Sequence, residues 1–213
     1  MIPKEVYDYN KAQLVDWLRN EAGSSNPDYF HAKKTGGLKL QQVPEEYCAL
    51  LTLLKASDIK TYLELGIGNG GSFVTACYFM KHSLETAVAV DNLAYRNLGI
   101  GQNETEILSY INSIETKASK FFINSSTDDY FKSIDSRLSY DCIFIDADHS
   151  YEGAKRDYEN SLKHINKGGL IIFHDINSAA CPGIMKLWQE VKQGKTNWEF
   201  IASKTCGIGV IKL

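Results

Sequence analysis

The stretch that decides the fold is DCIFIDADHSY, residues 141–151. Its apolar centre, CIFI, is short and bounded by polar residues, which is typical of a strand buried on both faces in a parallel sheet. Two carboxylates, an imidazole, a hydroxyl and a phenol follow directly. Because ligands bind outside the carboxyl ends of strands in open α/β sheets, we expect this cluster to line a functional site.

The same arrangement occurs three more times, at Glu64-Leu65-Gly66, Val90-Asp91-Asn92 and Phe173-His174-Asp175. Strands are predicted at Thr61–Leu65, Ala87–Val90, Lys120–Ile123, Tyr140–Ile145 and Leu170–Phe173. Helical patterns lie between them, at Ser72–Lys81, Glu104–Glu115, Asp128–Ile134 and Tyr151–His164. This alternation predicts a parallel sheet with helices on both faces.

The C-terminal part departs from the alternation. A helix near Ile184–Lys192 is followed by two strands, Trp198–Ala202 and Gly207–Ile211, with only a few residues between them. So short a link cannot form a right-handed parallel crossover, so the two strands are expected to form an antiparallel hairpin. The predicted fold is α/β, a doubly wound and mostly parallel seven-stranded sheet that ends in this hairpin.

Residues 1–43 are expected to form an N-terminal helix and a polar lid segment over the substrate pocket, with a Gly36-Gly37 pair that interrupts regular structure. Pro44 then opens a helix, with acids in its first turn. Residues 44–213 are expected to form a single α/β domain, because domains of this class commonly reach such lengths.

Composition excludes several classes of partner. The net charge of -3 provides no basic surface for nucleic acid or for an anionic membrane. The sequence contains neither an apolar stretch of membrane-span length nor an N-terminal signal peptide, so no membrane association is expected. The five cysteines show no CxxC pairing, which favours reduced thiols and a cytoplasmic location. A homo-oligomer is left open.

The glycine-rich stretch ELGIGNGGS, residues 64–72, follows a predicted strand and precedes a helix. It fits the dinucleotide pattern GxGxxG, which permits an NAD-type oxidoreductase. However, Glu64 places a carboxylate where it would repel a pyrophosphate, and Asp91 can accept hydrogen bonds from ribose hydroxyls. A positively charged nucleoside without phosphate satisfies both acids, and S-adenosylmethionine (SAM) is such a molecule.

Four motifs carry a family resemblance: ELGIGNGGS, VAVDN, DCIFIDADHSYEG and NKGGLIIFHD. They resemble the successive motifs of class I SAM-dependent methyltransferases, from about Pro44 to the C-terminus. FIDADHSYEGAKRDYE with GGLIIFHD is similar to small-molecule O-methyltransferases, including the metal-dependent macrolide-sugar enzymes and, more distantly, catechol O-methyltransferase. The resemblance implies an enzyme that transfers the methyl group of SAM to a hydroxyl of a sugar, phenol or polyketide.

The resemblance also implies roles for cofactor-binding residues. Glu64, Gly66 and Gly68 would hold the methionine end of SAM, and Asp91 would hold the ribose. Ser126 lies in a turn that resembles the adenine-contacting segment of these families. An equally good alternative is that Ser126 caps the helix that begins near residue 128.

A divalent metal, Mg or Mn-like, is implied at Asp146, His174 and Asp175. His174 departs from the family pattern, which usually has Glu, and imidazole suits Mn, Fe or Zn better than Mg. Because neighbouring strand residues point to opposite faces, His174 and Asp175 converge only if the chain leaves strand geometry there. The alternative is a His–Asp pair without metal.

His149, beside Asp146, matches the position of the catalytic base in these enzymes. A histidine titrates near neutral pH and can accept the proton of the substrate hydroxyl. The alternative is a polar turn in which Ser150 caps the next helix. At the level of function, the alternatives are an N-methyltransferase, a metal-independent methyltransferase, an NAD-type oxidoreductase and a non-catalytic nucleoside-binding module.

Overall fold

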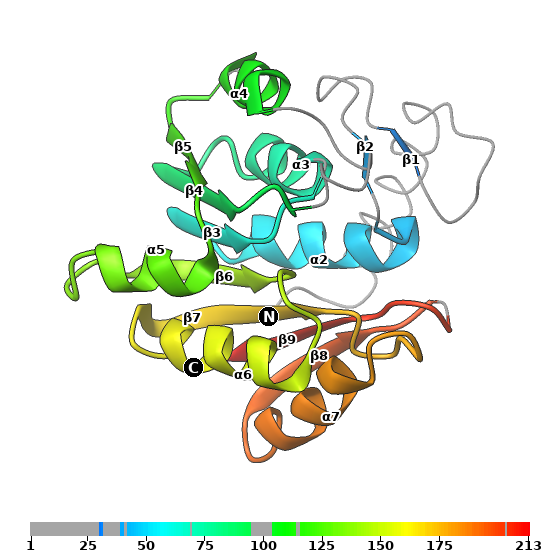
Figure 1. The fold of residues 1–213 in the computed structure, drawn as a ribbon. Helices are drawn as coiled ribbons and strands as arrows, with labels where there is room; N and C mark the ends of the chain where they lie inside the picture. Colours follow the sequence, from blue (N-terminus) through cyan, green and yellow to red (C-terminus); the bar gives the residue numbers. More distant parts are fainter. Residues whose placement is uncertain are drawn as a thin grey trace.

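The structure is a computed structural model, and it describes residues 30–31, 39–40, 42–68, 70–94, 104–113, 116–202 and 204–213 (Figure 1). The predicted N-terminal helix and most of the predicted lid segment lie outside these residues. Within that segment, the short strands β1 (Phe30–His31) and β2 (Lys39–Leu40) pair antiparallel. None of the helices in the described ranges has the length and apolarity that a membrane span requires.

Seven strands form the main sheet, in the order β5-β4-β3-β6-β7-β9-β8. They are β3 (Thr61–Leu65), β4 (Thr86–Asp91), β5 (Ser119–Asn124), β6 (Tyr140–Ile145), β7 (Ile165–His174), β8 (Thr196–Phe200) and β9 (Ile208–Lys212). The first five are parallel, and β9 lies antiparallel between β7 and β8. The predicted doubly wound sheet with a terminal hairpin is confirmed.

Strand β7 is longer than the sequence predicted, because it begins at Ile165 and not at Leu170. The Gly168-Gly169 pair lies within the strand. Gly168 adopts a φ of +82°, and its N–H donates to the Leu213 carbonyl at 2.7 Å. An irregularity in the pairing with β6, between Tyr140 and Cys142, absorbs the extra residues.

Helices cover both faces of the sheet (Figure 1). One face carries α2 (Pro44–Ala56), α3 (Gly71–Phe79) and α4 (Glu104–Ser113). The other face carries α5 (Thr127–Ser133), α6 (Tyr151–Ser161) and α7 (Pro182–Val191). Alternate residues of the central strands enter one of two apolar cores, which explains why these strands read as continuous apolar runs.

The register of β6 and β7 determines which site residues meet. Phe144 pairs with Ile172 and Ile145 with Phe173, so Asp146 and His174 follow as the next opposed positions. Phe144 and Ile172 both enter the core beneath α2 and α3, and the alternation places Asp146 and His174 on that same side. Strand pairing thus brings an acid and an imidazole together at the carboxyl edge of the sheet.

Glu64 is a fully buried carboxyl group in the core between β3 and α3. The Tyr62 hydroxyl donates to it at 2.5 Å, and the Ser72 hydroxyl donates to its other oxygen. Burial raises the pKa of Glu64 to about 8, an increase that these two hydrogen bonds only partly offset. Glu64 is therefore protonated in the folded protein near neutral pH.

This burial makes the stability pH-dependent with a defined sign. Because the folded pKa of about 8 exceeds the ordinary value of 4.5, the contribution of Glu64 to stability is fully present below about pH 4.5 and is lost as pH rises through 8. Glu64→Gln mimics the protonated acid and should avoid that loss. In urea unfolding, the free energy of unfolding of the variant, relative to that of the wild type, should increase by more than about 1 kcal/mol between pH about 5 and about 9. A gap that stays constant with pH, as expected for the exposed control Glu85→Gln, would contradict the buried-acid assignment.

Candidate active site

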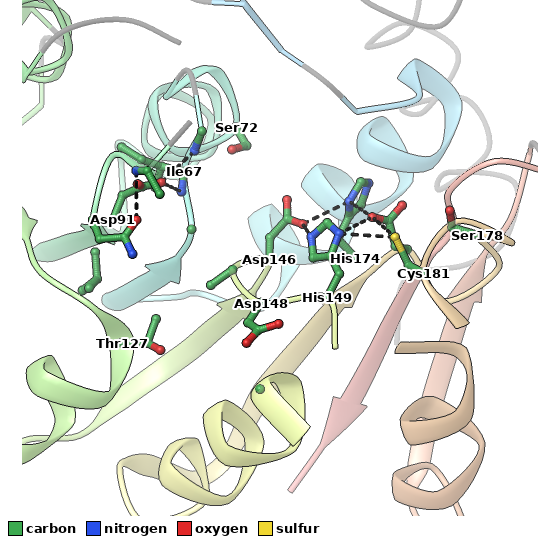
Figure 2. A pocket seen from close by; sticks show the side chains of 18 of the residues that line it. Ile67, Ser72, Asp91, Thr127, Asp146, Asp148, His149, His174, Ser178 and Cys181 are labelled. Carbon is green, nitrogen blue, oxygen red and sulfur yellow. Dashed lines mark hydrogen bonds and ion pairs between the residues drawn. The ribbon is translucent and has the colours of Figure 1, made fainter. Parts of the chain in front are cut away.

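A cavity of about 770 Å³ lies outside the carboxyl ends of the parallel strands (Figure 2). Its walls come from the loops after β3, β4, β5, β6 and β7, together with residues before α2 and before β9. The sheet order reverses between β3 and β6, which places the cavity at a topological switch point. The predicted site residues after all four strand ends therefore contribute to one region.

The glycine loop and the Asp146 loop touch at the centre of this cavity. Gly66 has a φ of +79°, and a Cβ at that position would lie 2.3 Å from the Asp146 carbonyl oxygen. Gly70 also adopts the left-handed conformation, with a φ of +82°, and serves as the N-cap of α3. Both positions require glycine, and the loop brings the N-terminus of α3 toward the cavity.

Asp91 holds the glycine loop in place. Its Oδ2 accepts hydrogen bonds from the backbone N–H groups of Ile67, at 2.9 Å, and Gly68, at 3.0 Å. Its Oδ1 accepts from the Leu93 N–H at 2.6 Å. A carboxylate offers about four acceptor positions, so one on Oδ1 is left for a ligand hydroxyl. Gly68 and Asp91, two of the residues expected to bind the cofactor, both line the cavity.

Glu64 lies behind Ser72 as seen from the cavity. Glu64 is fully buried and does not line the cavity, whereas Ser72 lines it and donates its hydroxyl hydrogen to Glu64. The sequence placed the Glu64 carboxylate at the ligand. In the structure Glu64 lies behind Ser72, and its first contacts are with Tyr62 and Ser72.

The two predicted capping serines have the expected geometry. Ser126 is the N-cap of α5, and its hydroxyl accepts from the Asp129 N–H at 3.1 Å. Ser150 is the N-cap of α6 and accepts from the Gly153 N–H at 3.0 Å. Ser126 also lines the cavity, so its capping role does not remove it from the ligand-facing surface.

Four residues at the other end of the cavity form a closed ring of alternating acids and imidazoles; Figure 2 shows Asp146, His149 and His174 pointing toward one another. Asp146 Oδ1 lies 3.3 Å from Nε2 of His149 and 3.2 Å from Nδ1 of His174. Asp175 Oδ2 lies 3.4 Å from Nδ1 of His149 and 3.5 Å from Nδ1 of His174. The predicted metal ligands and the predicted base are thus in direct contact.

The convergence of His174 and Asp175 depends on a backbone turn. Strand β7 ends at His174, and Asp175 adopts a φ of +60°, which is uncommon for a residue other than glycine. Continued strand geometry would send the Asp175 side chain to the opposite face. The departure from strand geometry that the sequence required at this point is therefore present.

Contacts within the ring shift the pKa values of three of its members. Burial opposes ionisation of Asp146, but the charge of His174 and hydrogen bonds from both histidines lower its pKa to about 2. The hydrogen bond to Asp146 raises the pKa of His149 despite partial burial. Burial would lower the pKa of His174, yet Asp146, with further hydrogen bonds to Asp175 and Cys206, raises it well above its usual value. The contacts within the ring thus favour the ionised form of Asp146 and increase the proton affinity of both imidazoles.

The ring also has the donors that a divalent ion requires. Its nitrogen and oxygen atoms lie 3.2–3.5 Å apart, a spacing that ligands of one ion can share. Nε2 of the buried His174 has no hydrogen-bond partner among the described residues. A cation would have to displace protons from the imidazoles, because both compete for the same lone pairs.

Three residues of this end were not predicted. Gln42, from the expected lid segment, donates to Asp146 Oδ2 at 3.2 Å. Cys181 is buried beside His149 and Asp175, and Cys206 is half-buried at the cavity wall. Burial raises the pKa of Cys181 to about 11. Neither cysteine belongs to a recognisable motif. The one sequence feature that pointed to a contact was the short separation of six residues between Asp175 and Cys181.

Comparison with known proteins matches this architecture. An uncharacterized protein of Acanthamoeba polyphaga mimivirus is 26% identical over 158 residues, 65% of this chain, and the match spans 63% of that protein's length. The O-methyltransferase TomG from Streptomyces achromogenes, involved in tomaymycin synthesis and solved with SAM, has a TM-score of 0.59 at 12% identity, covering 100% of this chain and 99% of TomG. The O-methyltransferase from Bacillus cereus, solved with S-adenosyl-L-homocysteine (SAH), has a TM-score of 0.56 at 17% identity. This match covers 100% of this chain and 93% of the Bacillus cereus chain.

At these identities the two solved structures establish the shared fold. The family evidence is separate and comes from the sequence of the central sheet: a methyltransferase domain matches residues 63–176, which include the glycine loop, Asp91, Asp146, His149 and His174. Since this match covers more than half of the chain, the protein belongs to the methyltransferase domain family.

Proposed function

We propose that this protein transfers the methyl group of SAM to a hydroxyl group of a small molecule. The observation that carries the proposal is the two-ended cavity. Asp91 and the glycine loop lie at one end, and the ring of Asp146, His149, His174 and Asp175 lies at the other. One end suits a nucleoside and the other suits proton removal, so donor and acceptor would meet where Gly66 touches the Asp146 loop.

At the donor end, the remaining acceptor position of Asp91 would bind a ribose hydroxyl of the nucleoside. Gly68 permits close approach of the ligand to the backbone. The Ser72 hydroxyl would lie at the methionine end and is oriented by the protonated Glu64. Ser126 would approach the adenine from the loop after β5. When bound, SAM supplies an electrophilic methyl group on a sulfonium. The solved TomG complex with SAM supports this choice of donor.

At the acceptor end, the chain must position a hydroxyl in line with the methyl group and remove its proton. We propose that His149 accepts this proton. Its ring is one-third exposed, whereas that of His174 is almost fully buried, so His149 is the imidazole that a substrate can reach. Asp146 would orient the ring and stabilise the imidazolium that forms, as a carboxylate beside a catalytic histidine does.

A divalent cation fits the same cluster. Asp146, His174 and Asp175 would hold it, because Nδ1 of His174 lies 3.2 Å from Asp146 Oδ1 and 3.5 Å from Asp175 Oδ2. Such an ion lowers the pKa of a coordinated hydroxyl. The imidazole ligand favours a Mn-like ion over Mg, which prefers oxygen ligands.

Asp91→Asn should weaken SAM binding by roughly 1.5–3 kcal/mol, because charge-assisted hydrogen bonds to the loop and the ligand are lost. Isothermal titration calorimetry with SAM and SAH measures this. Asp128→Asn is a matched control, since Asp128 lines the same end of the cavity without bonding the glycine loop. Tight NAD binding without affinity for SAM would reject the donor assignment.

Asp146→Asn and Asp175→Asn should each abolish metal-stimulated methyl transfer and leave SAM affinity nearly unchanged, because other strands hold the donor. Turnover is measured with and without chelator, and binding of SAM by calorimetry. Asp148→Asn serves as control, because Asp148 lines the cavity but bonds the Ser150 N–H. Chelated wild-type protein that works at its untreated rate would show that no metal is needed.

His149→Ala should reduce kcat by about 10²–10⁴-fold at neutral pH, the usual contribution of a general base. Part of the rate should return as pH rises, because hydroxide replaces the lost base. His82→Ala, an exposed histidine on another part of the chain, controls for a general effect. A folded His149→Ala protein with unchanged rate and unchanged pH profile would assign this histidine to structure.

A further inference from the structure

Cys181 places a thiol beside the acid–imidazole ring, where the proposed chemistry gives it no role. Its Sγ lies 3.3 Å from Nδ1 of His149 and 3.4 Å from Oδ2 of Asp175. The third edge, from Nδ1 of His149 to Oδ2 of Asp175, is 3.4 Å. A sulfur, a nitrogen and an oxygen donor therefore form a nearly equilateral triangle.

The triangle has the dimensions of a three-ligand metal site. Ligand atoms around one tetrahedral ion, at bond lengths of about 2.0–2.3 Å, are separated from one another by roughly 3.3–3.6 Å. His149, Asp175 and Cys181 all line the cavity. An ion above this triangle would keep its fourth position open toward the cavity, as in zinc sites with three protein ligands.

The backbone holds the triangle in this shape. After the left-handed turn at Asp175, the Ser178 N–H donates to the Asp175 carbonyl at 3.1 Å. The Cys181 N–H then donates to the Ser178 carbonyl at 2.9 Å, so two successive turns return the thiol to Asp175. At Gly183 a Cβ would lie 2.9 Å from the His149 carbonyl, so this glycine lets the start of α7 approach the histidine.

The donor chemistry selects the class of ion. Thiolate and imidazole favour zinc-type transition metals, whereas Mg prefers oxygen ligands. Nε2 of His149 faces Asp146 at 3.3 Å, which is the carboxylate contact that commonly orients a metal-binding histidine. Cys181 would bind as a thiolate, and its proton would pass to solvent as the ion binds.

We propose that His149, Asp175 and Cys181 form a binding site for a thiophilic divalent cation of the zinc type, and that its occupancy inhibits methyl transfer. The bound ion takes a nitrogen of His149, so the imidazole no longer accepts the substrate proton. It also takes Asp175, which the activating ion would share. The inhibition rests on the proposed function, whereas the binding of the cation does not.

Binding is tested by titrating Co²⁺ into the chelator-treated full chain, because a thiolate ligand gives a sulfur-to-cobalt charge-transfer absorption in the near ultraviolet. The wild type should bind about one equivalent with this absorption. Cys181→Ala should lose the absorption and bind more weakly by at least the roughly 10–100-fold cost of losing a supporting group. Cys77→Ala, which removes a buried thiol of α3, should behave as wild type, and near-ultraviolet circular dichroism confirms folding of each variant.

Two binding results would overturn the site. One is wild-type protein without the thiolate absorption. The other is an absorption that survives in Cys181→Ala and disappears in Cys206→Ala, since Cys206 forms a separate group with His174 and Asp175.

Inhibition is tested by titrating Zn²⁺ against methyl transfer in the presence of Mn²⁺, with each variant compared with its own zinc-free rate. Cys181→Ala should need at least about tenfold more Zn²⁺ than wild type for the same fractional inhibition. Zinc that binds without slowing transfer would overturn the inhibitory role. A chain that binds zinc through Cys181 but never transfers a methyl group would support the site and overturn the proposed function instead.

Discussion

The close approach of Gly66 to the Asp146 carbonyl is the constraint on which the cavity depends. A Cβ at Gly66 would lie 2.3 Å from that oxygen, so only glycine lets the loops after β3 and β6 meet. These strands are neighbours at the switch point. The pairing continues one residue past the end of β6, where the Asp146 N–H donates to the Leu65 carbonyl at 2.8 Å. This contact fixes the donor loop against the acid–imidazole ring and thereby sets the distance between the two ends of the cavity.

The acids of the donor end are hydrogen-bonded to the protein's own loop and side chains. Asp91 accepts three backbone N–H bonds, two of them from the glycine loop, so the loop is shaped before a nucleoside arrives. Glu64 is neutral, buried and bonded to Ser72, which faces the cavity. Such preorganisation reduces the ordering cost of binding, because the groups that meet the ligand are already held.

The acceptor end concentrates four ionisable groups, and their alternation makes this tolerable. Each acid of the ring lies between two imidazoles, and every acid-to-imidazole contact is within 3.5 Å. An unpaired charge in the same place would cost far more. A divalent cation can replace protons in the ring, because both compete for the same nitrogen and oxygen atoms. A thiol at its margin adds a third donor type.

The sequence by itself determined the strand–helix alternation, the terminal hairpin and the placement of acids and histidines at strand ends, because apolar periodicity and link length are local properties. The N-terminal helix and most of the lid segment remain predictions outside the described residues. Only the tertiary structure decided that Asp146 and His174 are opposed, since this follows from the register of β6 and β7. It also decided that Asp175 turns back, through a φ of +60°, and that Cys181 reaches the ring. Backbone dihedrals and the approach of distant segments leave no periodic signal in the chain, so the motifs that grouped Asp146, His174 and Asp175 could not give this geometry.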